Sequence, residues 1–540
     1  MNIDEFLNNL PPEVIAYINA QDEKIRLLEQ QIAKLTEQFL LLQKKVFGIK
    51  SEKSKYIVDD SDSQLNTFNE VEETAEEIPA PPEPEIITVK RKKKPKRTKA
   101  DLAKKLPVVK EVIDIPENER ECGICNGELH KIGVELVRRE LEIIPAQVFI
   151  KETYCNTYAC KDCEKETDEA NIVKPEVPAP IVKRGLASAS SATHVIYQKF
   201  VNAMPLYRQE KDWGNFDVII HRGTLANWII YIAKHWLTPL WLSWKLIVVA
   251  AQIKFADETV VQVLKEPGKK PQSESRMWCY ATGRGEIAPI VLYEYKPDRR
   301  GENAKQFLAG ASGFYLHTDG YAGYDAVEGA IHVGCWQHLR RKFTDAMPKN
   351  PPKDNPAYIG FTYCQKLFEL ERSFDEKNLT AQERYKQRLE KSKPVMDDFF
   401  KWVKTLEPLA GSKLATAVTY AKNQEERLLA VLLNGNLDIS TNRVENAIRP
   451  FAVGRKNWLF SDTVAGAESS AITYSVIETV KLNGINPYEY LLYISTNLPT
   501  VLSKDPNADL SDFQPWSPGI AERCLALKEK HNRTLVHSQD

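Results

Sequence analysis

The sequence predicts a multidomain α+β protein. Its 540 residues are enough for three or four domains at roughly 150 residues each, which excludes a single small binding domain. Hydrophobic residues make up 43% and charged residues 27%, so most of the chain has an ordinary globular composition. The residue pattern changes along the chain, from a heptad repeat through paired cysteines and helical stretches to a run of predicted strands.

The formal net charge of -1 conceals two charged blocks. Ten acidic residues and no Lys or Arg lie between Asp59 and Glu85, and ten basic residues lie between Lys90 and Lys105. The chain shows neither a secretion signal nor a membrane-spanning run, so we expect no membrane partner and a cytoplasmic location.

The first 50 residues carry a heptad repeat. Ile18, Ile25, Ile32, Phe39 and Val46 occupy one register, and Leu28, Leu35, Leu42 and Ile49 occupy the other. β-Branched residues at most a positions and Leu at most d positions favour a parallel two-stranded coiled coil, and therefore a homodimer. The alternative is an amphipathic helix that packs on the protein's own core.

Residues 51–105 have the composition of a linker. Four prolines interrupt the acidic block and the basic block has no apolar periodicity, so neither can bury enough surface to fold. The basic block is either a solvated spacer or an arm that neutralises DNA phosphates. The second interpretation assigns DNA contacts to Arg91, Lys92, Lys93, Lys94, Lys96 and Arg97.

Two CxxC pairs predict a structural zinc ribbon. Cys122, Cys125, Cys160 and Cys163 supply the four sulfurs of a closed tetrahedral Zn²⁺ site, and we expect strands over Val134 to Ile143 and Val148 to Tyr154 between the pairs. Cys155 and His130 are possible substitute ligands. The alternatives are buried cysteines without a metal, or a redox disulfide.

Residues 186–236 read as helices, with breaks expected at Gly214 and Gly223 and a second helix capped by Thr224. A helix-turn-helix with Arg222 near the start of its second helix would enter a DNA groove. A plain pair of packed helices is the alternative.

Strands are expected from residue 246. The order is three strands, a helix, a strand that ends at Asp319, a short helix and a fifth strand, which is the order of a ribonuclease H-like α/β core. Asp257 lies in the first strand, and in that fold the first and fourth strands are neighbours. The two carboxylates would therefore converge.

A third carboxylate completes a site for two Mg²⁺ (or Mn²⁺) ions. Glu445 lies in a predicted helix, and Arg443, Arg449, Arg455 and Lys456 surround it with charge suited to phosphates. Any single acid in this chain is more often a surface charge, but Asp257 in an apolar strand is hard to explain that way.

Long motifs then carry a family resemblance. The strings FADETVVQVL, HTDGYAGYDAV, GCWQHLRRKF and NRVENAIRPFAVGRKNWLF resemble the DDE transposases of the insertion-sequence group IS sixty-six, and the zipper and CxxC module resemble it in the same order. The resemblance implies a catalytic triad of Asp257, Asp319 and Glu445, cleavage at terminal inverted repeats followed by strand transfer into target DNA, and small accessory proteins of the same element.

The resemblance also implies a helical insertion between Asp319 and Glu445, and residues 354–433 read as helices. Cys335 and His338 resemble a CxxH pair of related transposases; the alternative is a packing Cys and a helix-capping His. The expected divisions are a coiled-coil dimerisation helix (1–50), a linker (51–110), a zinc-binding module (111–180), a helical DNA-binding segment (181–245), core residues 246–345, a helical insertion (346–435), core residues 436–495 and a C-terminal tail (496–540).

Two departures from the family pattern support a rival function. Ser440 stands where the family commonly has Asp, and Asn446 where it commonly has Arg; Arg449 is close enough in sequence to supply the missing charge. The first rival is therefore a DNA-binding protein with an inactive catalytic domain. The second is a scaffolding coiled-coil protein with a zinc fold, which has no use for Asp257 inside an apolar strand.

Overall fold

The computed structural model describes Gln21, Lys24, Arg120, Ile124 and residues 130–134, 147–160 and 171–536. Residues 56–150 belong to a separate unit, so the fold is described from residue 151 onward. Helices and a mixed sheet occur together, which confirms the α+β prediction. The predicted coiled coil and basic arm lie outside the described residues, apart from Gln21 and Lys24, which are helical.

The first strands are short. β1 (Tyr158–Cys160) and β2 (Asn171–Val173) pair antiparallel. The strand expected over Val148 to Tyr154 was wrong, because those residues are exposed and have no strand partner.

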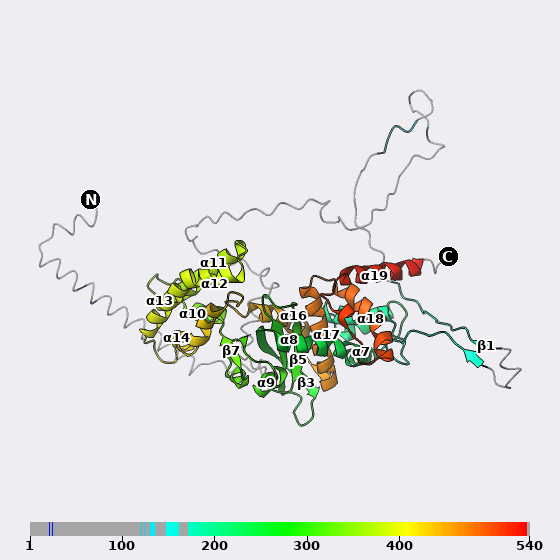
Figure 1. The fold of residues 1–540 in the computed structure, drawn as a ribbon, viewed down its shortest axis with the longest axis horizontal. Helices are drawn as coiled ribbons and strands as arrows, with labels where there is room; N and C mark the ends of the chain where they lie inside the picture. Colours follow the sequence, from blue (N-terminus) through cyan, green and yellow to red (C-terminus); the bar gives the residue numbers. More distant parts are fainter. Residues whose placement is uncertain are drawn as a thin grey trace. The chain divides into compact units, whose positions relative to one another are not determined.

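A mixed six-stranded sheet organises the body (Figure 1). Its members are β3 (Ile253–Lys265), β4 (Glu274–Thr282), β5 (Val291–Lys296), β6 (Phe314–His317), β7 (Ala330–Val333) and β8 (Ser461–Thr463). The order is β5-β4-β3-β6-β7, with β8 paired to the end of β3. β3, β4 and β5 run antiparallel, whereas β6 and β7 run parallel to β3. The first and fourth strands of the predicted order are therefore neighbours.

One helix lies over a face of the sheet, and a second lies along the β5 edge. α16 (Asn442–Trp458) lies against β3 and β4, and α17 (Val464–Leu482) lies against β5. Hydroxyl groups of α17 reach the strand backbone: Ser475 Oγ accepts from Tyr293 N at 2.7 Å, and Thr479 Oγ1 from Val291 N at 3.0 Å. These buried contacts fix α17 on β5.

Helices α8 (Thr238–Ala250) and α9 (Glu302–Phe307) cover the opposite face. The ring of Phe307 stacks on Tyr280 of β4 with 3.6 Å between centroids, and Trp241 meets Phe307 edge-on. The 3₁₀ helix η5 (Ala322–Ala326) follows β6. Both faces are thus covered, which agrees with the apolar character of β3.

The segment before the sheet contains α5 (Ala189–Phe200), α6 (Leu206–Gly214), α7 (Arg222–Ile232) and the π-helix η4 (Ala233–Leu237). Gly214 ends α6 as expected, but Gly223 lies inside α7. Thr224 is not the cap, because the backbone N–H groups of Thr224 and Leu225 already donate to His221 O. Residues 246–250 are the end of α8 rather than a strand, because a short apolar run suits either element.

The stretch between β7 and α16 is helical, as expected (Figure 1). It contains α10 (Trp336–Ala346), α11 (Pro356–Glu376), α12 (Ala381–Gln387), the π-helix η6 (Arg388–Ser392), α13 (Lys393–Lys404), α14 (Lys413–Asn423), α15 (Glu425–Leu429) and η7 (Ala430–Leu433). Buried Arg388 joins these elements: it donates to Glu371 at 2.7 Å and to the carbonyls of Val431 and Leu437 at 3.1 and 2.7 Å. The helices α18 (Pro487–Lys504) and α19 (Ile520–Val536) end the described chain, with η8 (Ser511–Phe513) between them.

Among the described residues, every helix is too short or too polar to cross a membrane.

Candidate active site

Two predicted acids lie at the same level of two adjacent parallel strands. Phe255 of β3 is paired with His317 of β6, and Asp257 and Asp319 each follow two residues later. Backbone N–H groups hold both carboxylates: Glu258 N donates to Asp257 Oδ1 at 2.8 Å, and Tyr321 N donates to Asp319 Oδ1 at 2.9 Å. Gly320, with φ of 93°, turns the chain directly after Asp319.

Glu445 approaches from α16, one turn into the helix. The carbonyl of Ala447 accepts a hydrogen bond from Tyr293 Oη of β5, and Arg455 donates to Thr259 Oγ1 of β3 at 3.3 Å. These contacts lay α16 along the sheet face that carries Asp257. The Thr441 hydroxyl donates to Glu445 Oε1 at 2.6 Å and limits the carboxylate's freedom.

The electrostatics of Asp257 show that Glu258, Asp319 and Glu445 lie near enough to act on its charge. Burial raises the pKa of Asp257 well above its usual range, and the negative charges of Glu258, Asp319 and Glu445 raise that pKa further. A divalent cation between these carboxylates would reverse the effect of their mutual repulsion. Clustered carboxylate oxygens are also the ligands that Mg²⁺ prefers. The residues present therefore fit a divalent metal site.

Glu258 is a site residue that the sequence reasoning missed. It follows Asp257 in β3 and is buried, with 1% of its side chain exposed. Arg299 Nε donates to Glu258 Oε1 at 2.5 Å, and the Tyr324 hydroxyl donates to Oε2. Burial and the charge of Asp319 raise the pKa of Glu258, against the opposing effect of Arg299. Its position beside Asp257 in a strand buried on both faces was the available signal.

Cys335 and His338 lie beside Glu445. Cys335 Sγ accepts a hydrogen bond from Thr441 N at 3.3 Å and lies 3.2 Å from Thr441 Oγ1, and His338 Nδ1 is 3.9 Å from Glu445 Oε1. Burial alone would lower the pKa of His338, but the charges of Cys335 and Glu445 outweigh it and raise that pKa to about 9. Burial would raise the pKa of the Cys335 thiol, but His338 brings the pKa below its usual value. The Cys335 and His338 side chains therefore interact directly with each other beside Glu445.

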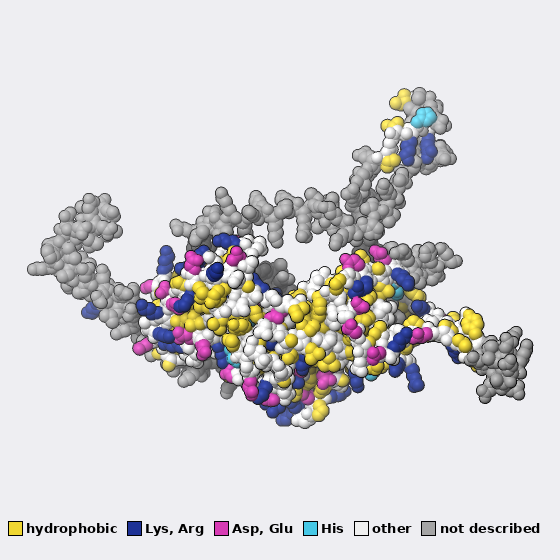
Figure 2. All heavy atoms as spheres, in the orientation of Figure 1, with side chains coloured by type: hydrophobic (Ala, Val, Ile, Leu, Met, Phe, Trp, Pro, Cys, Tyr) yellow, Lys and Arg dark blue, Asp and Glu magenta, His cyan; other side chains and the backbone are white. Residues whose placement is uncertain are grey.

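The predicted basic residues of α16 divide into two groups. Arg443 donates to Asp438 at 3.3 Å and lies over the Phe255 ring, and Arg455 bonds to the β3 backbone, so both point toward the sheet. Arg449 and Lys456 are exposed. Arg222 is exposed at the start of α7. Figure 2 shows Lys and Arg interspersed with Asp and Glu over one face of the molecule.

Most predicted zinc ligands lie outside the described residues. Cys122, Cys125 and Cys163 are among these, and of Cys160 only the backbone, the last residue of β1, is described. The possible substitutes His130 and Cys155 are exposed. Arg91, Lys92, Lys93, Lys94, Lys96 and Arg97 also lie outside the described residues.

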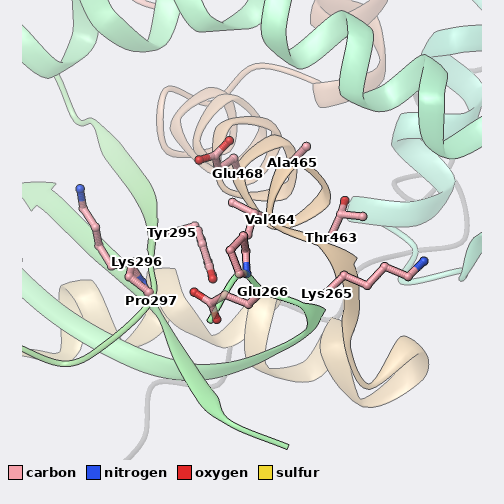
Figure 3. Close-up of a pocket in the computed structure, with 10 residues that line it drawn as sticks. Lys265, Glu266, Tyr295, Lys296, Pro297, Thr463, Val464, Ala465 and Glu468 are labelled. Atoms are coloured by element: carbon pink, nitrogen blue, oxygen red, sulfur yellow. The ribbon is translucent and has the colours of Figure 1, made fainter. Parts of the chain in front are cut away.

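A cavity of about 610 Å³ lies at the far end of β3 and does not include the acids. Glu266, Tyr295 and Lys296 line it together with Thr463 and Glu468 at the start of α17 (Figure 3). Acidic and basic side chains both line this open cavity, so its lining indicates no particular ligand.

Comparisons with known proteins identify three consecutive regions. Residues 34–110 match the family profile described as "Transposase C of IS166 homeodomain". Residues 119–164 match the "zinc-finger binding domain of transposase IS66". Residues 184–469 match the "Transposase IS66 family" and span the three acids together with the helical insertion.

Similar proteins occur in Sinorhizobium fredii. Uncharacterized protein y4jD is 29% identical over 433 residues, which cover 77% of this chain and 81% of that protein. Uncharacterized protein y4qI is 28% identical over 511 residues, which cover 90% of this chain and 89% of that protein. The similarity thus extends across nearly the whole sequence.

Proposed function

Because the chain belongs to the IS66 transposase family, we propose that it binds the terminal inverted repeats of an insertion sequence and catalyses DNA strand cleavage and strand transfer. The observation that supports this proposal is the position of Asp257 and Asp319, each two residues after a pair in adjacent parallel strands, with Glu445 near enough to raise the pKa of Asp257. The reaction would take place on DNA in the bacterial cytoplasm, at the nucleoid.

The proposed catalytic core is ribonuclease H-like. The order β5-β4-β3-β6-β7 supports it, as do the antiparallel first three strands and the parallel last two. In this proposal core residues 246–345 and 436–495 form one domain, and residues 346–435 are an insertion within it. The other proposed divisions are the coiled coil, the linker, the zinc module, the helical DNA-binding segment and the tail, with the bounds given above.

Asp257, Asp319 and Glu445 are proposed to hold two Mg²⁺ or Mn²⁺ ions. Such a pair of ions lowers the pKa of an attacking water or 3′-hydroxyl and stabilises the leaving oxygen. The hydrogen bonds from Glu258 N and Tyr321 N keep one oxygen of each Asp in place. The Thr441 hydroxyl restricts Glu445 in the same way, and these hydrogen bonds support the proposed roles of the three carboxylates.

DNA binding is proposed for several separate regions. Exposed Arg449 and Lys456 of α16 are suited to phosphates near the acids, and Arg222 to DNA at α7. Arg443 and Arg455 would act mainly by holding α16 against β3. The basic arm would add affinity that does not depend on DNA sequence and weakens as salt rises.

The remaining modules are proposed to assemble the complex. A structural Zn²⁺ bound by Cys122, Cys125, Cys160 and Cys163 would fold the zinc finger, and the N-terminal coiled coil would join two protomers so that both element ends are handled together. Small accessory proteins of the same element are further proposed partners.

Cleavage and joining of DNA that bears the flanking inverted repeats tests this function. We expect Mg²⁺-dependent nicking at the repeat ends and transfer of the released 3′ end. Zinc analysis of the same protein is expected to find at least one bound Zn²⁺ per chain.

The rival function is a DNA-binding protein with an inactive catalytic domain. Asn446 favours it, since Asn446 Oδ1 accepts a hydrogen bond from Arg449 at 3.0 Å and thereby engages a cation that would otherwise face DNA. The rival predicts binding to the repeats with no nicking in Mg²⁺ or Mn²⁺. The same cleavage assay therefore separates the two.

A further inference from the structure

Three different metal-binding side chains meet beside the proposed active site. Cys335, His338 and Glu445 each offer one ligand atom, and these atoms all lie within 4.8 Å of one another. Within the described part of the chain, this is the one group of three or more such donors. Cys335 is fully buried, and the side chains of His338 and Glu445 are 15% and 18% exposed.

Two segments far apart in the sequence build the group. Cys335 directly precedes α10 and His338 lies three residues later, so both face the same side of its first turn. Glu445 lies in the first turn of α16. The backbone joins the segments: Trp336 N donates to Ile439 O at 3.1 Å, and Thr441 N donates to Cys335 Sγ at 3.3 Å.

The spacing suits a tetrahedral ion. Bonds of about 2.3 Å to sulfur and about 2.0 Å to nitrogen and oxygen place ligand atoms roughly 3.3 to 3.6 Å apart. His338 Nδ1 and Glu445 Oε1 are already 3.9 Å apart. Side-chain rotations that move each ligand atom by up to about 1 Å would bring the three atoms to these distances around one ion. The backbone would not need to move.

We propose that Cys335, His338 and Glu445 bind a Zn²⁺ ion that is distinct from the zinc of the CxxC module. Sulfur and imidazole ligands select zinc over magnesium, whereas the neighbouring Asp257 and Asp319 offer only oxygen. Binding releases the thiol proton of Cys335 to solvent, and a water molecule completes the four ligands.

The site shares Glu445 with the proposed catalytic metals, and this consequence alone rests on the proposed function. The Thr441 hydroxyl lies beside both Glu445 and the proposed zinc ligand Cys335, 2.6 Å from Glu445 Oε1 and 3.2 Å from Cys335 Sγ. A carboxylate held by zinc on the Cys335 side is withdrawn from Asp257 and Asp319. Zinc therefore inhibits Mg²⁺-dependent cleavage by competing for Glu445.

Cobalt binding to the full-length protein tests the site. The protein is first loaded with zinc and dialysed against a weak chelator until its zinc content is constant, and Co²⁺ is then added. We expect one further equivalent of Co²⁺ to bind, with a thiolate-to-cobalt charge-transfer band. Cys335→Ser is expected to abolish this band, and Cys364→Ser, which changes another buried cysteine, to retain it.

A second variant covers the case in which Cys335→Ser does not fold. His338→Gln keeps the thiol and alters a partly exposed position, and we expect it to weaken Co²⁺ binding about tenfold or more. Wild-type Co²⁺ affinity in folded His338→Gln, or no further equivalent in the wild type, overturns the proposal. The assay needs no DNA. Co²⁺ binding without any DNA cleavage would contradict the proposed function but would still support the zinc site.

Discussion

The rings of Phe255 and His317 stack face to face, with 4.2 Å between their centroids and 9° between their planes. Phe255 belongs to β3 and His317 to β6, and the two residues are paired in the parallel ladder. The stack sets the relative level of the two strands directly before Asp257 and Asp319. A shift of one residue would turn one carboxylate to the opposite face of the sheet.

Asp257→Asn is expected to abolish Mg²⁺-dependent nicking of DNA that carries the terminal repeats, because an amide replaces a charged metal ligand. The same change should not lower thermal stability in metal-free buffer. Burial and three neighbouring negative charges already disfavour the ionised Asp257, as its raised pKa records. Nicking and thermal unfolding are measured on the same preparation.

Asp462→Asn is the matched control. Asp462 is an exposed acid on β8 that forms an ion pair with exposed Lys265. The substitution should leave nicking unchanged. Full nicking activity in folded Asp257→Asn would rule out the proposed metal ligand.

Arg299→Ala is expected to lower the free energy of unfolding by about 2 to 4 kcal/mol at neutral pH, because it leaves the Glu258 carboxylate buried without its cation. The loss should shrink as the pH falls and Glu258 takes up a proton. Urea unfolding at several pH values measures it.

Arg300→Ala removes an exposed neighbour paired with Asp298 and should lower the free energy of unfolding much less than Arg299→Ala, because an exposed ion pair contributes little. Equal effects of the two variants would argue against a special role for the Glu258 pair.

Lys254 provides a prediction about pH. Its side chain is buried in β3, with Nζ 2.6 Å from Ala251 O, and burial lowers its pKa to about 8. The unfolded chain keeps this proton up to the ordinary value of 10.5, so it holds more protons than the folded protein between those values. Stability should therefore rise with pH across this window.

In Lys254→Met this contribution is expected to vanish, and stability near pH 7 should rise by as much as about 3 kcal/mol, at 1.4 kcal/mol per pKa unit. Urea unfolding from pH 7 to 10 measures both effects. Lys270→Met, at an exposed position after the same strand, serves as the control and should retain the wild-type slope. A Lys254→Met slope equal to that of the wild type would show that Lys254 is charged in the folded protein.

Ile32→Lys tests the predicted coiled coil. Ile32 occupies a central a position, and a charge there would face its counterpart across the seam. We expect the full-length dimer to dissociate, as measured by analytical ultracentrifugation. Ala33→Lys adds the same charge at a b position and should leave the dimer intact. A dimer that survives Ile32→Lys would indicate that the protomers associate elsewhere.

The sequence allowed Asp257, Asp319 and Glu445 to be selected because each interrupts or follows a strongly patterned element. The helical insertion was also predictable, from its length and periodicity. The end of α8 was not, since Leu246 to Ala250 is a short apolar run that suits a buried helix or a strand equally well. The pairing of Glu258 with Arg299 was hidden for another reason: a partner 41 residues away is set by the tertiary fold.

Glycine 334 and Trp336 anchor the two ends of the helical insertion. Gly334 N donates to Arg427 O at 2.8 Å, and Trp336 N donates to Ile439 O at 3.1 Å, so the chain leaves the core and returns to it at adjoining points. The turn between α11 and α12, at exposed Lys377 and Asn378, is therefore a suitable place to graft a fluorescent reporter. Such a fusion would allow the protein to be followed in living cells while the two anchor points keep their spacing.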